Sequence, residues 1–495
     1  MDLEILLPLL LYLVNLASIF VIIFVRRKEI STSYAWIMVL IFVPVIGFLF
    51  YYFFGSTVKL ESLGKKYRLT EEENNYINQR KIEMANLRIK GEAFSNIKTK
   101  QYEDMILVNA KNAKCFFSED NNVELLINGQ EKFPRLFEEI EKAEHSINVM
   151  YFIFKTKDKI GQQFLDLLVK KAKQGVKVRV LYDALGCLKT KLKDFDELVE
   201  AGGEVQRFLP SKVRTLLTVN YRLHRKMVII DGQSCYTGGI NVGDDYLGEY
   251  AHITPWRDTS IRVTGTAVAE LQLLFFKDWI FCAKQNKSIR SDFDFFKFMD
   301  EQGEHYFPEP KETGNMACQV VEGNPEDKYA VLRDSYAKMC TSAKDYLYIQ
   351  SPYFVPDETL FDAIRMAAQG GVDVRMMLPG IADKDFVYKV AMSYVEELLE
   401  AGVRIYIHKG FIHSKTMVID DYVSSIGTTN LDIRSFRLDY EVNLVTYDED
   451  FAVNCKEVFL RDILDCEEVE LEKFKKRGKI QYMLECICRF FSPLS

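Results

Sequence analysis

Two short stretches of this sequence repeat one pattern: a histidine, a lysine two residues later, and an aspartate five residues after the lysine. The six residues are His224, Lys226 and Asp231 in the first copy and His413, Lys415 and Asp420 in the second. Alternate residues of a β-strand point to the same face, so each His–Lys pair can enter one pocket. The chain has only six histidines. Because two of them occupy equivalent places, the pattern predicts a shared chemical role.

Each copy is followed at the same distance by a glycine-containing turn that ends in an asparagine. The first turn begins at Gly238 and ends in Asn241, and the second begins at Gly427 and ends in Asn430. Glycine lets a backbone approach a ligand closely, and an asparagine amide can donate a hydrogen bond to a phosphate oxygen. The repeated asparagine favours a functional pocket over two structural ion pairs, which would not need it.

These residue types together predict phosphoryl transfer in one site that both copies share. One imidazole can attack phosphorus as a nucleophile, and the other can protonate the leaving alcohol and then deprotonate the incoming one. The lysines and asparagines would stabilise the negative charge on the phosphoryl oxygens. Because two lysines supply positive charge, we expect no metal ion and no other cofactor.

The elements that position the two copies also repeat. Strand-like segments at residues 146–154 and 176–181 precede the first copy, and segments at 345–354 and 372–378 precede the second. Helix-like segments lie between them. Apolar strands that alternate with helices predict an α/β fold, here with two pseudo-symmetric halves. Each half would carry one copy, so that neither half makes the full site alone.

The chain begins with two apolar runs, at residues 3–25 and 34–54. Each has the roughly 20 residues that an α-helix needs to cross a bilayer, and we expect a transmembrane hairpin. A cleaved signal peptide is disfavoured because the chain starts with Asp2 and Glu4 instead of basic residues. The basic residues at 26–28 and those after the second run favour opposite orientations, so the membrane face that carries the rest stays open.

These patterns divide the chain into five segments. We expect the hairpin at 1–56, a charged stalk at 57–115, the first half at 116–290, a connection at 291–316, and the second half with a C-terminal helix at 317–495. Within the first half, residues 209–222 mix basic and apolar side chains. They could form an ordinary surface loop or rest on an anionic bilayer.

Composition narrows the class of partner. The net charge is −7, whereas a nucleic-acid binder usually carries a basic surplus, so we expect no nucleic-acid partner.

The ten cysteines lack the spacing of metal ligands. We therefore expect most of them to be buried thiols, with neither a zinc site nor a disulfide framework.

The doubled pattern resembles the paired HKD motif of the phospholipase D superfamily. Along nearly its whole length the chain is similar to bacterial cardiolipin synthases. The residues that carry this closer resemblance include Trp256-Arg257-Asp258, Gln350-Ser351-Pro352-Tyr353-Phe354, and Asn430-Leu431-Asp432 running on to Glu441. Two positions depart from the family pattern: Thr428 stands where serine is commoner, and Asn324-Pro325 stands where Gly-Pro is expected.

The resemblance implies a mixed sheet flanked by helices in each half, and a multi-pass protein of the bacterial plasma membrane. It also implies a reaction. A histidine attacks one phosphatidylglycerol, glycerol leaves, and the phosphatidyl group passes to a second phosphatidylglycerol to give cardiolipin. Phosphatidylglycerol and other membrane phospholipids are therefore the expected partners, and no oligomeric state is predicted.

The resemblance assigns roles to individual residues as well. By analogy His224 is the nucleophile and His413 the acid and base, although pseudo-symmetry leaves the reverse assignment open. Asp258 and Glu441 would orient the two histidines, while Asp231 would brace its motif from within, as would its counterpart in the second copy. A phospholipid hydrolase, another phosphatidyltransferase, a nuclease and an inactive membrane scaffold are the alternatives. The apolar runs disfavour the nuclease, and the intact motifs disfavour the scaffold.

Overall fold

The computed structural model describes residues 3–25, 30–52, 94–209, 220–249, 254–286 and 305–492. Several predicted features lie wholly or partly outside these ranges. They are the basic connector at 26–28, most of the stalk at 57–115, residues 210–219 of the mixed basic and apolar segment, most of the connection at 291–316, and the chain end at 493–495.

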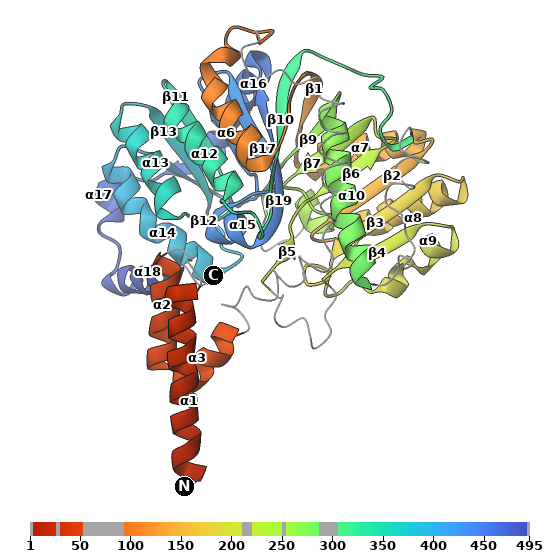
Figure 1. The fold of residues 1–495 in the computed structure, drawn as a ribbon. Coiled ribbons are helices and arrows are strands. Elements are labelled where there is room, and N and C mark those ends of the chain that lie inside the picture. Colours follow the sequence, from red (N-terminus) through yellow and green to blue (C-terminus); the bar gives the residue numbers. More distant parts are fainter. Residues whose placement is uncertain are drawn as a thin grey trace.

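One mixed sheet of sixteen strands runs through both halves of the molecule (Figure 1). Its path is β20-β14-β13-β11-β16-β17-β19-β10-β1-β9-β7-β6-β2-β3-β4, and β5 pairs with β19 off this path. At the centre β1 (Phe117–Ile127) and β10 (Met316–Gly323) pair antiparallel, with Phe117 opposite Gln319. Outward from this pair, equivalent strands of the two halves follow in the same order. The predicted α/β fold with two pseudo-symmetric halves is confirmed.

The other strands fall into one set for each half. Those of the first half are β2 (Ser146–Tyr151), β3 (Lys177–Asp183), β4 (Glu204–Phe208), β5 (Arg222–Leu223), β6 (Met227–Ile230), β7 (Ser234–Gly238), β8 (Trp256–Arg257) and β9 (Thr259–Thr264). Those of the second half are β11 (Tyr346–Gln350), β12 (Phe354–Val355), β13 (Asp373–Pro379), β14 (Arg404–His408), β15 (Phe411–Ile412), β16 (Thr416–Ile419), β17 (Val423–Gly427), β18 (Leu431–Asp432), β19 (Asp439–Tyr447) and β20 (Cys466–Glu468).

Helices flank the sheet on both sides (Figure 1). In the first half they are α7 (Asn128–Lys142), α8 (Lys159–Lys173), η4 (Leu192–Phe195), α9 (Asp196–Glu200), η6 (Asp244–Leu247) and α10 (Ala267–Asn286). In the second half they are α12 (Val331–Ser342), α13 (Glu358–Gln369), α14 (Asp385–Glu400), α15 (Ile433–Arg437), α16 (Glu449–Asp462), η7 (Ile463–Asp465), α17 (Leu471–Phe474) and α18 (Lys479–Phe491).

The two halves share a hydrophobic core. Met150 of β2, Phe275 of α10 and Val442 of β19 all belong to one buried apolar cluster, and each half has a further cluster of its own. Because cores are close-packed, a shared core holds the two motifs in a fixed relative position. Most cysteines contribute to these cores, as predicted: those at 115, 187, 235, 282, 318, 340 and 455 are buried.

The described part of the predicted stalk packs against the second half. It forms η3 (Thr99–Tyr102) and α6 (Glu103–Ala113). Met105 and Ile106 of α6 are fully buried in the same apolar cluster as Leu332 and Tyr336 of α12. This segment therefore joins the core of the second half, although it precedes the first half in the sequence.

The N-terminal apolar runs form helices that stand out from the body (Figure 1). α1 (Leu3–Phe20) continues into the π-helical turn η1 (Val21–Val25), but the second run is divided into α2 (Ile30–Phe42) and α3 (Pro44–Phe50). The break falls at Val43 because Pro44 lacks the N–H that would continue the helix and instead begins the next one. Among the described residues, no helix is both long and apolar enough to cross a membrane.

Candidate active site

Two short strand pairs cross between the halves and bring the histidines to the centre. β5 leads directly into His224 and pairs in parallel with the start of β19, where Leu223 lies opposite Tyr440. β15 leads into His413 and pairs in parallel with β8, where Ile412 lies opposite Arg257. Each half therefore lays the strand before its histidine against a strand of the other half.

Each histidine contacts a carboxylate of the opposite half. His224 Nδ1 lies 2.7 Å from Glu441 Oε1, and His413 Nδ1 lies 2.7 Å from Asp258 Oδ2. All four residues are buried. An ionised carboxylate only accepts hydrogen bonds, so each contact places the imidazole proton on Nδ1 and leaves the lone pair on Nε2. The structure thus brings Asp258 and Glu441 to the histidines that the resemblance assigns them to orient.

The lysines of the two motifs are buried beside these pairs. Lys226 Nζ donates to the backbone carbonyl of His224, and Lys415 Nζ donates to that of His413, both at 2.5 Å. Burial lowers the pKa of Lys226 to about 7 and that of Lys415 to about 8. An anion bound between them would restore the charged forms, because a nearby opposite charge favours the ammonium.

The histidines differ in how readily they take up a proton. Burial, followed by the charges of Lys226 and Lys415, holds the pKa of His224 well below its usual value. Burial and the Lys415 charge also lower the pKa of His413, to about 4, but the Asp258 carboxylate acts in the opposite direction. Protonation is therefore assisted at His413 by an ionised partner.

The two carboxylates differ as well. Burial raises the pKa of Glu441 to about 7, against the pull of the Lys226 ammonium. Burial also acts to raise the pKa of Asp258, but the His413 imidazole and the Lys415 ammonium outweigh it, so this pKa lies below its usual value. The His413–Asp258 pair is thus the one whose carboxylate stays charged over the wider pH range.

One pair of equivalent turn positions also differs between the two halves, although the Thr428 hydroxyl acts to lower the pKa of Glu441 against its burial. Thr428 Oγ1 donates to Glu441 Oε2 at 2.5 Å, so the hydroxyl at this position helps to hold the Glu441 carboxylate. The first half has Gly239 there, and a Cβ at Gly239 would lie 2.0 Å from Asp258 Oδ1. The glycine leaves space for the Asp258 carboxylate close to the turn.

The two asparagines are not equivalent. The side chain of Asn241 is already engaged, because its Oδ1 accepts from the backbone N–H of Ile153 at 3.1 Å and its Nδ2 donates to Tyr246 Oη at 2.9 Å. Asn430 is buried, and within the described chain its Oδ1 has no hydrogen-bond partner. Asn430 is therefore the asparagine whose amide is available to a ligand, and its Nδ2 is the atom that can donate to a phosphoryl oxygen.

The motif aspartates lie away from the histidines. Asp231 follows β6 and accepts hydrogen bonds from the backbone N–H groups of residues 144, 145 and 146 at 2.7–2.8 Å. Asp420 does the same for residues 344, 345 and 346 at 2.8–3.1 Å. The four residues of β6 lie between Lys226 and Asp231, so five steps of extended chain, or roughly 16 Å, separate the two. Both aspartates hold the first residues of a central strand, which fits bracing and not contact with a ligand.

Comparison with known proteins places this site in a family. The family described as "Cardiolipin synthase, PLD-like domain" matches residues 136–255 and 336–463, one match in each half. The family described as "Phospholipase D-nuclease N-terminal" matches residues 13–56. The major cardiolipin synthase ClsA of Bacillus subtilis is 39% identical over 490 residues, with 98% of each chain covered. The chain belongs to the cardiolipin synthase family.

Two further comparisons agree with this membership. A cardiolipin synthase of Listeria welshimeri is 38% identical over 491 residues, again with 98% of each chain covered. The crystal structure of phosphatidylserine synthase from Haemophilus influenzae superposes with a TM-score of 0.57 at 16% identity, covering 80% of this chain and 97% of that one. At this identity the superposition supports the fold alone.

In this cardiolipin synthase family member, Arg225 is a residue of the site that the sequence analysis did not identify. Its side chain is completely buried and donates to the Glu441 carbonyl at 3.2 Å and to Asn324 Oδ1 at 2.6 Å, and it forms an ion pair with Asp278. Arg225 thereby fixes the strand that carries Glu441. Asn324 could have pointed to Arg225, because it departs from the expected family pattern and its Oδ1 accepts a hydrogen bond from this arginine.

Aromatic rings enclose both imidazoles. The distance between ring centroids is 4.9 Å for Phe152 and His224 and 5.2 Å for Trp256 and His413.

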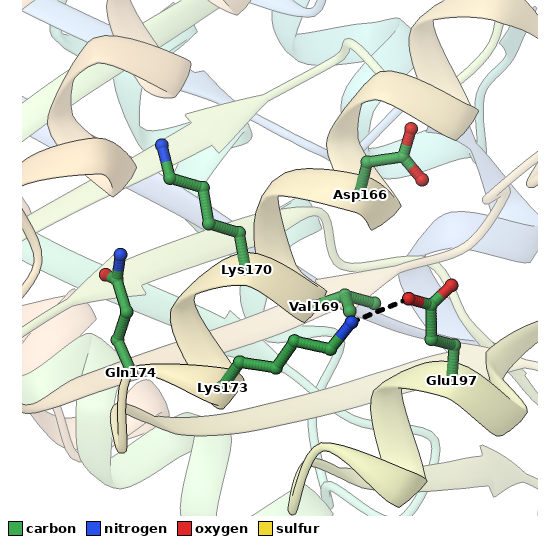
Figure 2. A pocket seen from close by; sticks show the side chains of 6 residues that line it. All are labelled: Asp166, Val169, Lys170, Lys173, Gln174 and Glu197. Carbon is green, nitrogen blue, oxygen red and sulfur yellow. Dashed lines mark hydrogen bonds and ion pairs between the residues drawn. The ribbon is translucent and has the colours of Figure 1, made fainter.

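A surface hollow elsewhere on the protein contains none of the predicted site residues. It is lined by Asp166, Val169, Lys170, Lys173 and Gln174 of the α8 region together with Glu197 of α9 (Figure 2). An ion pair of 2.8 Å between Lys173 and Glu197 bridges it.

Proposed function

We propose that the chain joins two phosphatidylglycerol molecules into cardiolipin and glycerol, through a phosphatidyl group held covalently on His224. The main support is the crossed pair of His–carboxylate contacts, His224 with Glu441 and His413 with Asp258, beside two buried lysines. One imidazole with a free Nε2 lone pair and a second that carries a proton on Nε2, next to buried positive charge, suit transfer of an anionic phosphoryl group.

The reaction proceeds in two displacements. In the first, His224 Nε2 attacks phosphorus, the bond from phosphorus to the glycerol oxygen breaks, and His413 donates a proton to the leaving glycerol. In the second, His413 takes the proton of the primary hydroxyl of another phosphatidylglycerol. That oxygen attacks phosphorus, the phosphorus–nitrogen bond breaks, and both histidines return to their starting states.

The inequality of the two pairs supports this assignment of roles. A nucleophile must be neutral, and burial with the neighbouring lysines keeps the pKa of His224 low. An acid must hold a proton, and at His413 the ionised Asp258 opposes the burial and the Lys415 charge that lower this pKa to about 4. We assign binding of the phosphoryl oxygens to Lys226, Lys415 and Asn430. We assign a supporting role to Asn241, whose side chain already has partners.

Product analysis with phosphatidylglycerol vesicles tests the proposal. The purified full-length chain should release one glycerol for each cardiolipin formed, and should do so in excess chelator if the lysines supply the charge. Phosphatidic acid and glycerol without cardiolipin would support the hydrolase instead. Substrate labelled in its phosphate should leave the label on His224 in a quenched reaction. His224→Ala should abolish labelling and turnover, whereas His145→Ala, at an exposed histidine, should change neither.

We also propose that the N-terminal helices insert into the bacterial plasma membrane as a hairpin, within the segment 1–56. Leu13, Phe20 and Phe24 of this region are exposed apolar side chains. The buried Asn15 of α1 donates to the Pro44 carbonyl at 3.0 Å, which satisfies a backbone group that lipid could not. Pairing of β1 with β10 supports the proposed division of the remainder into halves at 116–290 and 317–495.

A further inference from the structure

The C-terminal helix α18 is attached to the body through its polar side. Arg489 pairs with Glu397 of α14 at 2.5 Å and lies 4.1 Å from the Tyr394 ring centroid. Glu485, one turn earlier, is almost completely buried and pairs with Arg477 at 2.8 Å. The side of α18 that faces α14 is thus held by ion pairs and a cation–π contact.

The apolar side of α18 faces away from the protein. Its six large apolar side chains are Ile480, Met483, Leu484, Ile487, Phe490 and Phe491, with exposed fractions between 40% and 72%. At 100° per residue these positions fall within an arc of about 120°. A surface helix of a soluble protein normally turns such a stripe toward the core. Because the apolar stripe of α18 instead faces outward, its burial requires an apolar partner outside the body of the protein.

Charge and position indicate what this phase is. Residues 473–479 carry a basic run immediately before α18. Lys473 pairs with Glu470 and Lys475 with Glu400, while none of the ion pairs among described residues includes Lys476 or Lys479. Lysines beside an amphipathic helix favour an anionic lipid surface.

The place of α18 in the molecule agrees with a lipid surface. In the view of Figure 1, α18 lies on the side of the body from which α1 and α2 project. The outward apolar stripe of α18 is therefore on the side where exposed apolar residues of the N-terminal helices, such as Leu13 and Phe20, are found.

We infer that α18 lies along the headgroup region of an anionic bilayer, with Ile480, Ile487 and their apolar neighbours in the lipid and Lys476 and Lys479 against the headgroups. The inference rests on the proposed function only in that the same bilayer supplies the substrate. It gives the catalytic body a second attachment besides the N-terminal helices, and so fixes the body's tilt on the membrane.

An environment-sensitive fluorophore at position 487 tests this placement. The background is the full chain with Cys466→Ser, Cys486→Ser and Cys488→Ser, because the seven remaining cysteines are buried. Ile487→Cys carries the label on the apolar side of α18. Asp166→Cys carries it on α8, in the surface hollow of Figure 2, as the matched control. Both proteins are reconstituted into vesicles of phosphatidylglycerol with phosphatidylcholine, or of phosphatidylcholine alone.

The expected result is a several-fold rise in emission at position 487 in the phosphatidylglycerol vesicles, quenched by a nitroxide lipid, with no change at position 166. Lys476→Glu with Lys479→Glu should reduce that rise. Emission at position 487 that stays at the level of the water-exposed control would overturn the inference. A rise that also occurs in detergent and disappears on dilution of the protein would overturn it too, because a second copy would then cover the stripe.

The readout is independent of catalysis. If the label enters the lipid and no cardiolipin forms, the docking surface stands and the proposed function fails. If cardiolipin forms and the label stays in water, the proposed function stands and the membrane placement of α18 fails. Ile487→Asp should lower turnover of phosphatidylglycerol in vesicles several-fold relative to Ile487→Leu, with equal turnover of a short-chain substrate below its micelle concentration. Equal turnover by both variants in vesicles would count against the inference.

Discussion

At the scale of single residues, the two histidine–carboxylate pairs have the same geometry and unequal surroundings. Glu441 accepts a hydrogen bond from the Thr428 hydroxyl, whereas Asp258 accepts one from the backbone N–H of Thr259 at 2.7 Å. The carboxylate of Glu441, the longer side chain, therefore has a side-chain donor, and that of Asp258, the shorter one, has a backbone donor. This inequality supports different roles for two imidazoles that the sequence repeat makes look alike.

Thr428→Val tests the side-chain donor, because it removes the hydroxyl and keeps the shape. Loss of a hydrogen bond to a charged group costs about 1.5–3 kcal/mol, so we expect kcat/KM for cardiolipin formation to fall roughly 10- to 100-fold. Thr428→Ser keeps the donor and should remain within a few-fold of the parent. Equal activity of the two variants would show that the hydroxyl does not matter.

The lysines predict a loss of activity at alkaline pH. Burial lowers the pKa of Lys226 to about 7 and of Lys415 to about 8, so the free enzyme loses the charges that attract the phosphodiester as pH rises through this range. The substrate does not titrate there. We expect kcat/KM measured in vesicles to fall between pH 7 and pH 9.

Lys415→Arg provides the control, since guanidinium keeps its proton throughout this range. Whatever activity this variant retains should fall less steeply above pH 8. A kcat/KM that climbs steadily up to pH 9 in the parent enzyme would contradict the prediction.

At the scale of elements, the site depends on short strands that cross between the halves. β5 and β15 have two residues each, yet they place His224 beside β19 and His413 beside β8. The turn after β7 comes close to Asp258 and to the His413 carbonyl, and the turn after β17 bonds to Glu441 of β19. Their residue types therefore control how near each carboxylate can come to its histidine.

Gly239→Ala tests the close approach after β7. The added Cβ would lie 2.0 Å from Asp258 Oδ1 and 3.0 Å from the His413 carbonyl oxygen, so Asp258 must move away from His413. We expect a large loss of cardiolipin formation, and we expect circular dichroism to show that the variant still folds. Gly478→Ala is the control because its Cβ would meet no atom within 4 Å. If Gly239→Ala had the activity of the parent, the idea that a Cβ at position 239 displaces Asp258 would be wrong.

Asp231 acts on the element scale as well, through the start of β2. Asp231→Ala removes the acceptor of three backbone N–H groups, and we expect the free energy of unfolding to fall by about 1–3 kcal/mol. Turnover per folded molecule should stay close to that of the parent. A variant of unchanged stability that cannot form cardiolipin would instead give Asp231 a direct part in the chemistry.

At the scale of the whole molecule, the proposed membrane attachments lie on one side of the body (Figure 1). β5, which leads into His224, lies at the lower edge of the body in the same view. A site that opens toward the lipid would receive both substrates from the bilayer. Such an arrangement favours a second lipid over water as the acceptor, because closing a site against water suppresses hydrolysis.

Leu13→Arg combined with Leu16→Arg tests the N-terminal attachment at exposed positions of α1. A charged residue at the centre of a bilayer costs about 2.5–3.5 kcal/mol. We expect alkaline washing to release a larger fraction of this variant from membranes than of the parent. Leu188→Arg, on an exposed leucine of the body, is the control and should be released no more than the parent. Equal release of all three proteins would contradict the proposed anchor.

The sequence by itself determined the chemistry and the class of fold. The His-x-Lys pairs, the asparagines and the repeated strand–helix order are local patterns, because strand alternation and spacing along the chain decide which side chains share a face. They predicted two halves with one motif each. The comparisons confirmed the family to which the whole chain belongs.

Only the tertiary structure decided which residues meet. His224 and Glu441 are 217 positions apart, and a contact over that distance depends on how the two halves of the sheet join at β1 and β10, which no local pattern encodes. The same holds for Asn241, whose amide is taken up by Ile153 and Tyr246. It holds for α18 too, since amphipathicity is local, whereas the face that meets the body is set by the ion pair of Arg489 with α14 and by that of Glu485 with Arg477.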